Sequence, residues 1–237
     1  MKTLVGLISL LAILLVALAG PLYKFNILDL GSAFGALRFG VYVGMAALVL
    51  LLIEIIFMRK NISWSAAGVS ALLAIVAVGL PMNMMNKAKS VPPIHDISTD
   101  LIDPPKFVAL VALRAGASNP VEYAGEDTAR QQREAYPELS TQKYVQTSQQ
   151  IFDAAEATVN KLGWELVNAD KTLGIIEATD TTAWFGFKDD VVIRIRSMAA
   201  ETSLDVRSKS RVGKSDLGKN AERINVFIKK INAQLGD

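Results

Sequence analysis

The sequence predicts an α+β protein, in which an N-terminal three-helix transmembrane region precedes a soluble domain of helix, antiparallel sheet and helix. Three observations support this class: three long runs with almost no charge before residue 87, alternating apolar and polar residues after residue 164, and helical periodicity on both sides of those strands. The apolar share of 51% exceeds the need of a soluble domain, and the excess lies in the N-terminal runs.

The three runs are predicted to span a membrane. Residues 3–23 contain no charge, residues 39–58 contain only Glu54, and residues 61–86 contain none. Each run is long enough to cross a hydrocarbon core about 30 Å thick as a helix. The predicted transmembrane helices cover about 3–23, 37–58 and 63–85.

Cations beside these runs set the predicted orientation. Lys2 precedes the first run, and Arg59 and Lys60 fill the short turn between the second and third, so both places are predicted to be cytoplasmic. The C-terminal domain is then expected in the periplasm, and the chain to be a multi-pass protein of a bacterial inner membrane. The stretch 17–20 also resembles a signal-peptide cleavage site; we favour an uncleaved helix, and cleavage would leave the orientation unchanged.

The small residues of the second apolar run and the absence of cysteine limit the possible partners and chemistry. Gly31, Gly35, Gly40 and Gly44 form two small-xxx-small spacings, which fit either packing within the bundle or a homo-oligomer. No cysteine is present, which excludes disulfides, a thiol nucleophile and lipid attachment through cysteine. The expected partners are the lipid bilayer and a membrane protein or a second copy, and nucleic acid is not expected in the periplasm.

Two segments link the membrane region to the domain. Residues 87–113 are predicted to be an extended proline-rich arm, because four prolines interrupt residues 87–107 and no periodicity is sustained. Residues 114–146 are predicted to be an irregular connector, because AGASNP and YPELS carry turn residues.

Residues 147–237 are predicted to fold as one helix, four strands and a second helix. Ile151, Ala155 and Val159 share a helical face, with Thr147 or Ser148 as cap and Gly163 as stop. WELVNAD, LGIIEATD, DDVVIRIRS and TSLDVRSKS read as strands. From Leu217 onward, apolar residues recur every three or four positions, which predicts an amphipathic helix covering one face of the sheet.

The last two strands predict a specific hairpin. If Ile195 faces Leu204, then Ile193 faces Val206 and Arg194 lies opposite Asp205. Apolar side chains then meet on one face of the sheet and opposite charges on the other.

The stretch RSKSRVGKSDLGKNAERI, residues 207–224, suggests an anion site. Position 208 is serine rather than glycine, and the context is not a βαβ unit, so a P-loop is excluded. Either the cations are solvated and Ser215 or Asp216 caps the last helix, or the stretch binds an anion non-covalently near the helix start. The candidate ligand-binding residues are Arg207, Ser210, Arg211, Gly213, Lys214, Ser215, Asn220 and Arg223.

The charge distribution leaves two interpretations open. Residues 96–190 carry 8 Lys and Arg with 16 Asp and Glu, whereas residues 194–230 carry 10 with 4. The two parts either face each other within the fold, or the basic part is a surface for anionic lipid or an acidic polymer of the envelope.

His95, Asp96 and Asp100 are the candidate metal ligands, because one imidazole with nearby carboxylates suits a divalent cation. The alternative is that these polar side chains bond local amides in a turn-rich arm. Asp189 and Asp190, near Glu177 on the neighbouring strand, suggest either a glycosidase-like carboxylate pair or ion pairs with Arg194 or Arg207. No cofactor is expected unless the metal site forms.

Three long motifs, PPIHDISTDLIDPPKF, IIEATDTTAWFGFKDDVVIRIR and LDVRSKSRVGKSDLGKNAERI, resemble those of the bacterial and plastid family called domain of unknown function 1499, DUF1499, over residues 90–235. The resemblance implies one exported or membrane-tethered domain that includes the proline-rich arm, and it implies no activity. The leading hypothesis is a non-enzymatic envelope protein that binds an anionic ligand or a partner. A metal-assisted hydrolase and a structural subunit of a membrane complex are the alternatives.

Overall fold

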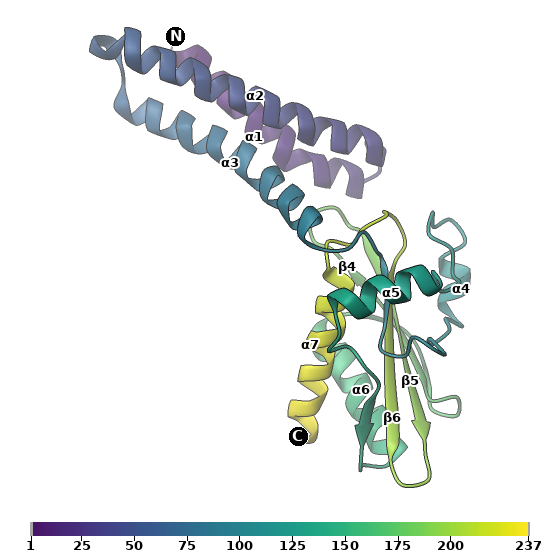
Figure 1. Cartoon of the computed structure of the whole chain (residues 1–237). Helices are drawn as coiled ribbons and strands as arrows, with labels where there is room; N and C mark the ends of the chain where they lie inside the picture. The colour runs from purple at the N-terminus through teal and green to yellow at the C-terminus, as the bar shows by residue number, and fades with distance from the viewer. Residues whose placement is uncertain (1, 237) are drawn as a thin grey trace. The chain divides into compact units, whose positions relative to one another are not determined.

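The computed structural model describes residues 2–236 and divides into two compact units, which we describe separately (Figure 1). Unit 1 contains the residues up to Lys89 together with Ala183–Gly186. Unit 2 contains Ser90–Thr182 and the residues from Phe187 onward. Long helices in unit 1 and an antiparallel sheet with helices in unit 2 confirm the predicted α+β class.

Unit 1 is a bundle of apolar helices. Its elements are α1 (Lys2–Lys24), α2 (Leu30–Phe57), the 3₁₀ turn η1 (Arg59–Asn61) and α3 (Trp64–Ser90). Helices α1, α2 and α3 are each long and apolar enough to cross a membrane. The structure therefore supports a membrane-spanning N-terminal region.

Glycines set how closely these helices approach. A Cβ added at Gly40 of α2 would lie 2.8 Å from Val16 Cγ2 of α1, and one added at Gly44 would lie 2.9 Å from Val78 Cγ2 of α3. An added Cβ at Gly35 meets nothing within 4 Å. Gly40 and Gly44 thus serve packing within the bundle, one of the two roles that their spacing predicts.

Helices α2 and α3 extend beyond the predicted spans. Helix α2 already begins at Leu30, because the Asp29 carboxylate accepts the Ser32 amide at 3.0 Å and caps the first turn. Helix α3 continues to Ser90, so its last turn occupies the start of the predicted extended arm.

The segment Ala183–Gly186 completes unit 1 through its aromatic side chains. Pro21 lacks an amide hydrogen, so the Ala17 carbonyl has no helical donor four residues later. The Trp184 indole Nε1 donates to that carbonyl at 3.1 Å. Phe185 is buried and stacks on Phe34 with ring centroids 5.7 Å apart.

Unit 2 is built on a six-stranded antiparallel sheet. Its strands are β1 (Asp96–Ser98), β2 (Gln142–Tyr144), β3 (Glu165–Asp170), β4 (Ile175–Thr181), β5 (Lys188–Ser197) and β6 (Thr202–Ser210). The order is β1-β6-β5-β4-β3, and β2 also pairs with β6. The predicted hairpin register is confirmed, with Ile195 opposite Leu204 and Arg194 opposite Asp205.

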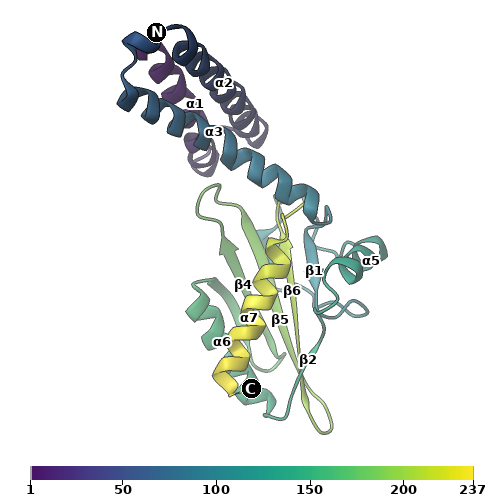
Figure 2. The ribbon, with the colours of Figure 1, turned by 60° about the vertical axis from the view of Figure 1, so that its left-hand side comes forward.

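The helices of unit 2 are α4 (Leu110–Leu113), α5 (Glu126–Ala135), α6 (Ser148–Leu162) and α7 (Lys219–Leu235). Helices α6 and α7 cover the apolar face of the sheet, where Ile151 and Phe227 join the same core as Ile193 (Figure 2). Thr147 and Gln150 form a capping box at the start of α6, and Gly163 ends it with φ 74°.

Residues 91–146 contain more regular structure than the predicted arm and connector. Strands β1 and β2 have three residues each and α4 has four, which is too short for a periodic sequence signal. Helix α5 is polar on almost every side, and its buried positions include Thr128 and Gln132. These elements form because the rest of the domain supplies their partners.

Candidate functional site

The most unusual feature of unit 2 is the sheet face opposite α6 and α7, which is charged and buried. Strand alternation places Glu177, Asp190, Arg194, Asp205, Arg207 and Lys209 on this face, which we call the charged face. The carboxylates among them, and Lys209, are 0% exposed. The cover comes from residues 99–124, between β1 and α5, which we call the covering segment.

Four groups of hydrogen bonds and ion pairs, which we call clamps, hold the charged face. The first clamp is centred on Asp96. Arg207 donates to its two carboxylate oxygens at 2.8 and 2.9 Å, and Lys209 Nζ donates to Oδ2 at 2.9 Å. Arg207 also donates to the Val121 carbonyl and lies 4.9 Å from the ring centre of Phe107. Burial lowers the pKa of Lys209, and the charge of Asp96 acts in the opposite direction. The geometry is that of a bidentate buried ion pair.

A second clamp is centred on Asp190. Arg114 NH1 donates to Oδ2 at 2.6 Å, and Arg211 reaches both carboxylate oxygens at 2.8 Å. Thr179 Oγ1 donates to Oδ1 at 2.7 Å. Arg114 belongs to the covering segment and is 3% exposed, so this clamp fixes that segment to strands β5 and β6.

The third clamp uses backbone amides instead of a cation. The Glu177 carboxylate accepts the amides of Val108 and Ala109, both at 2.7 Å, and that of Leu110 at 3.3 Å. These are the free amides at the start of α4, where a negative charge is favourable. Glu177 therefore holds the first turn of α4 on the sheet.

A fourth clamp lies at the next step along β5. Arg194 and Arg196 both donate to Asp100, Asp103 and Asp205, with distances from 3.0 to 3.3 Å. Burial raises the pKa of Asp100, but the amides of Asp103 and Ile102 and the two guanidinium groups outweigh it, so the net shift is downward. Asp100 therefore remains charged and holds its own turn to the sheet.

Arg223 and Asn220, two further predicted ligand-binding residues, also bond internally. Arg223 reaches Asp180 at 2.8 Å and Asp189 at 2.7 Å. Asn220 donates to Ser210 Oγ and accepts from Ser208 Oγ.

For the start of α7 the sequence left two alternatives open, a cap from Ser215 or Asp216 and a bound external anion. Asp216 accepts the amides of Gly218 at 2.8 Å and Asn220 at 2.7 Å. Burial raises the pKa of Asp216, and these two amides act in the opposite direction. A carboxylate of the chain thus occupies the place of an external anion, as the capping alternative suggests.

Of the predicted anion-binding residues, Lys214 and Gly213 are exposed and Ser215 is half-buried. Arg207, Arg211 and Arg223 each face a carboxylate of the chain. The positive charges of these arginines are therefore already paired. An external anion could bind them only if an internal ion pair were first broken.

The structure gives the three candidate metal ligands separate partners. His95 Nδ1 lies 3.4 Å from the Lys214 carbonyl, Asp96 faces Arg207, and Asp100 faces Arg194. Within residues 2–236, no three or more His, Asp and Glu side chains are grouped so that they could hold a metal ion. Asp100 accepts the amides of Ile102 and Asp103, as the local-bonding alternative predicts, whereas the cationic partners of Asp96 lie on β6.

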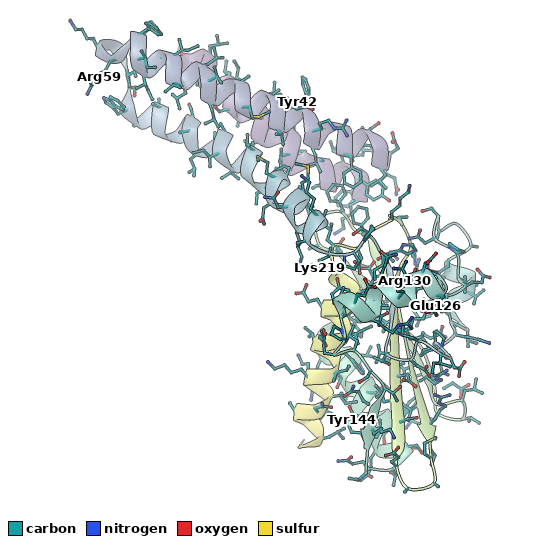
Figure 3. All side chains as sticks on the ribbon, in the orientation of Figure 1. Tyr42, Arg59, Glu126, Arg130, Tyr144 and Lys219 are labelled. Atoms are coloured by element: carbon teal, nitrogen blue, oxygen red, sulfur yellow. The ribbon has the colours of Figure 1, made fainter. Side chains whose placement is uncertain are left out.

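Ion pairs explain the uneven charge along the chain. Arginines and a lysine from the basic part pair with Asp96, Asp100, Asp180, Asp189 and Asp190 from the acidic part. The two parts face each other within the fold, which is the first of the two interpretations. By contrast, Glu126 and Arg130 of α5 extend from the surface (Figure 3), and the ion pairs of this helix are exposed.

Arg114 is the main residue of this network that the sequence did not single out. It lies in a stretch without periodicity, and its partner Asp190 is 76 residues away. A lone arginine in such a segment carries no local signal of burial.

A family model described as "Protein of unknown function (DUF1499)" matches residues 96–231, more than half of the chain. No curated protein matches the sequence. The matched range includes the strands of the sheet, the covering segment and almost all of α7.

Proposed function

The chain belongs to the DUF1499 family, and we propose that it is a membrane-anchored, non-enzymatic binding protein of the bacterial envelope. The family description names no activity, so the proposal depends on the residues of this chain. Three apolar helices supply the anchor, and the folded unit supplies the binding surface.

The observation that carries the proposal is the internal use of the charged motif residues. Asp96 and Asp190, which a catalytic reading would need as ligand or acid, each accept from two cationic side chains. A carboxylate held in this way cannot take up a substrate proton or a metal without leaving a buried cation unpaired, which costs several kcal/mol. These residues therefore favour a framework over a reaction centre.

The proposed compartment depends on the cations next to the helices. Arg59 and Lys60 lie between α2 and α3, and Lys2 precedes the first apolar run. From the tendency of cations to stay on the cytoplasmic side, we propose that Lys2, Arg59 and Lys60 are cytoplasmic and that unit 2 lies in the periplasm. Lys24, Lys87 and Lys89 lie at the opposite helix ends. Binding would then involve components of the envelope or of the membrane itself.

The internal pairs also change how an anionic ligand should be tested. Arg211→Ala would remove a partner of buried Asp190, so weaker binding by this variant would not distinguish a ligand site from a damaged fold. Lys214 is exposed, and among the described residues its ammonium makes no ion pair. A substitution of Lys214 therefore tests anion binding in this region without removing a partner of a buried carboxylate.

Photo-crosslinking in intact membranes tests the proposal. A photoreactive residue is placed at Val108 on the covering segment, at Lys214, or at Val226 of α7 as the control, in the full chain. Val108 and Val226 are 53% and 45% exposed, so they are comparably accessible. We expect a discrete adduct with protein, polymer or lipid from position 108 or 214 and none from 226. No adduct at 108 and 214, or equal adducts at all three positions, contradicts a selective binding role.

A further inference from the structure

Exposed aliphatic side chains gather on the covering segment. Val108, Val111 and Leu113 are 53%, 43% and 54% exposed, and Ile102, on the same segment, is 98% exposed. The other large exposed apolar residues of unit 2, such as Val145 and Val226, are dispersed along the chain. Single exposed apolar residues are ordinary, whereas a group of them marks a contact surface. We call Val108, Val111 and Leu113 the aliphatic patch.

The aliphatic patch is held rigidly from below. Glu177 binds the amides at the start of α4, and Arg114, directly after α4, pairs with Asp190. Leu110, on the inner side of the same turn, is 0% exposed and packs with Phe107 and Val192. The patch is thus exposed although its backbone is fixed at both ends, so little ordering would be lost when it binds.

The buried charges also fix the position of α4, in addition to any contribution they make to stability. Replacing a buried ion pair with apolar residues is often neutral or stabilising, so the charged face is a costly way to fill an interior. Its hydrogen bonds have defined directions, and two of its four clamps hold Val108 and Arg114, on either side of α4. The network therefore orients α4 in one way relative to the sheet.

The composition of the patch indicates what covers it. Its side chains are valine and leucine, with exposed Ala112 and Ala115 beside them, and it has none of the tryptophan, tyrosine or arginine anchors typical of protein interfaces. Val111, Ala112 and Leu113 lie on the exposed sides of α4, whereas Leu110 faces the sheet. Exposed Lys106 flanks it and suits anionic headgroups. Aliphatic side chains beside a lysine are typical of shallow insertion into a lipid surface.

The bilayer is also the occupant that the chain itself brings close. Three helices of this chain can cross a membrane, and only residues 91–95 separate α3 from β1. A tether this short gives a high effective concentration of lipid to any exposed patch that its length allows to reach the bilayer. A weak apolar contact is therefore enough for frequent docking.

We propose that the aliphatic patch inserts into the headgroup region of the bilayer that anchors the chain. This inference rests on the proposed function and names lipid as a partner of the domain. The framework of buried charges then serves to present α4 to the membrane surface.

The test measures depth in the bilayer for the full chain. Because the chain has no cysteine, the variants Val111→Cys, Val226→Cys and Leu52→Cys each give one labelling position for an environment-sensitive fluorophore. Each labelled protein is reconstituted into phospholipid vesicles with and without brominated acyl chains. Val111 and Val226 are 43% and 45% exposed, which makes position 226 a matched control, and Leu52 of α2 reports the anchor.

Brominated lipid is expected to quench most of the emission at positions 52 and 111, several times more than at position 226. Quenching at 52 with a label at 111 that behaves like the one at 226 overturns lipid docking and leaves the anchor intact. A blue shift at 111 without quenching also overturns it, because the patch then meets protein instead of lipid. No quenching at 52 contradicts the anchor and with it the proposed function.

Discussion

Single residues of the charged face act as shared partners. Asp190 accepts hydrogen bonds from Arg114 of the covering segment, from Arg211 directly after β6, and from Thr179 of strand β4. One carboxylate thus joins three parts of the chain that are distant in sequence. Its contribution is geometric, because the desolvation of buried charges cancels much of their attraction.

The substitution Asp190→Asn should strongly destabilise unit 2. It keeps the side-chain shape but leaves the guanidinium groups of Arg114 and Arg211 without their counter-charge, a change that typically costs about 3–5 kcal/mol. The free energy of unfolding is measured by chemical denaturation of the full chain in detergent, with the sheet signal followed by circular dichroism.

The matched control is Asp127→Asn on α5. Asp127 pairs with Arg130 at 3.4 Å, and its side chain is 90% exposed, so solvent replaces the lost contact. The control should change the free energy of unfolding far less than Asp190→Asn does. Equal effects of the two substitutions would mean that the buried network contributes no more than a surface ion pair.

Sequence reasoning identified local pairs of residues and missed distant ones. Arg194 opposite Asp205 follows from strand alternation, and the structure has that pair. The pairing of Asp96 with Arg207 spans 111 residues, and no periodicity connects them. The sequence therefore suggested free cations at Arg207, Arg211 and Arg223, where the fold supplies a carboxylate to each.

Long helices and strands could be predicted from the sequence, whereas short ones could not. The apolar helices and β5 with β6 are long enough to show their period, so their type was evident from the sequence. Strand β1 and helix α4 have three and four residues, and they are defined by contacts to β6 and to Glu177. Tertiary partners decide such elements, so a single sequence without periodicity indicates only loop there.

Helix α1 illustrates how an element obtains a missing partner. Pro21 leaves the Ala17 carbonyl free, and the Trp184 indole approaches close enough to bond it because Gly20 has no side chain. A Cβ at position 20 would lie 2.6 Å from Trp184 Cδ1 and 2.8 Å from the Trp184 carbonyl oxygen. The second contact is to backbone, so a rotamer change alone cannot relieve it.

We therefore expect Gly20→Ala to displace Trp184 from α1, although alanine usually stabilises a helix by about 1 kcal/mol relative to glycine. The displacement is read as greater access of acrylamide to tryptophan fluorescence, in a background where Trp64 and Trp164 are phenylalanine. Gly35→Ala is the control, because its added Cβ meets nothing within 4 Å. Unchanged quenching in Gly20→Ala would contradict the packing of this segment on α1.

At the scale of the whole molecule, charge has two separate tasks. In unit 2, anions and cations from different parts of the sequence neutralise each other inside the fold. In the membrane region, cations gather beside helix ends, at Arg59 and Lys60 among others. The net charge of +2 therefore says little about binding. It adds the paired charges inside unit 2 to the cations beside the apolar helices.

The cations beside the apolar helices predict which parts of the chain can be reached from outside the membrane that these helices can span. Because cations favour the cytoplasmic side, Lys60 should be inside and unit 2 outside. The variants Lys60→Cys and Met198→Cys each place one thiol in a cysteine-free chain, and Met198 is 55% exposed in the turn between β5 and β6. In intact spheroplasts, a membrane-impermeant maleimide should label position 198 at once and position 60 only after detergent is added. If position 60 alone is labelled before detergent is added, the orientation is the reverse of the predicted one. The folded domain, with its aliphatic patch, then lies at the cytoplasmic face.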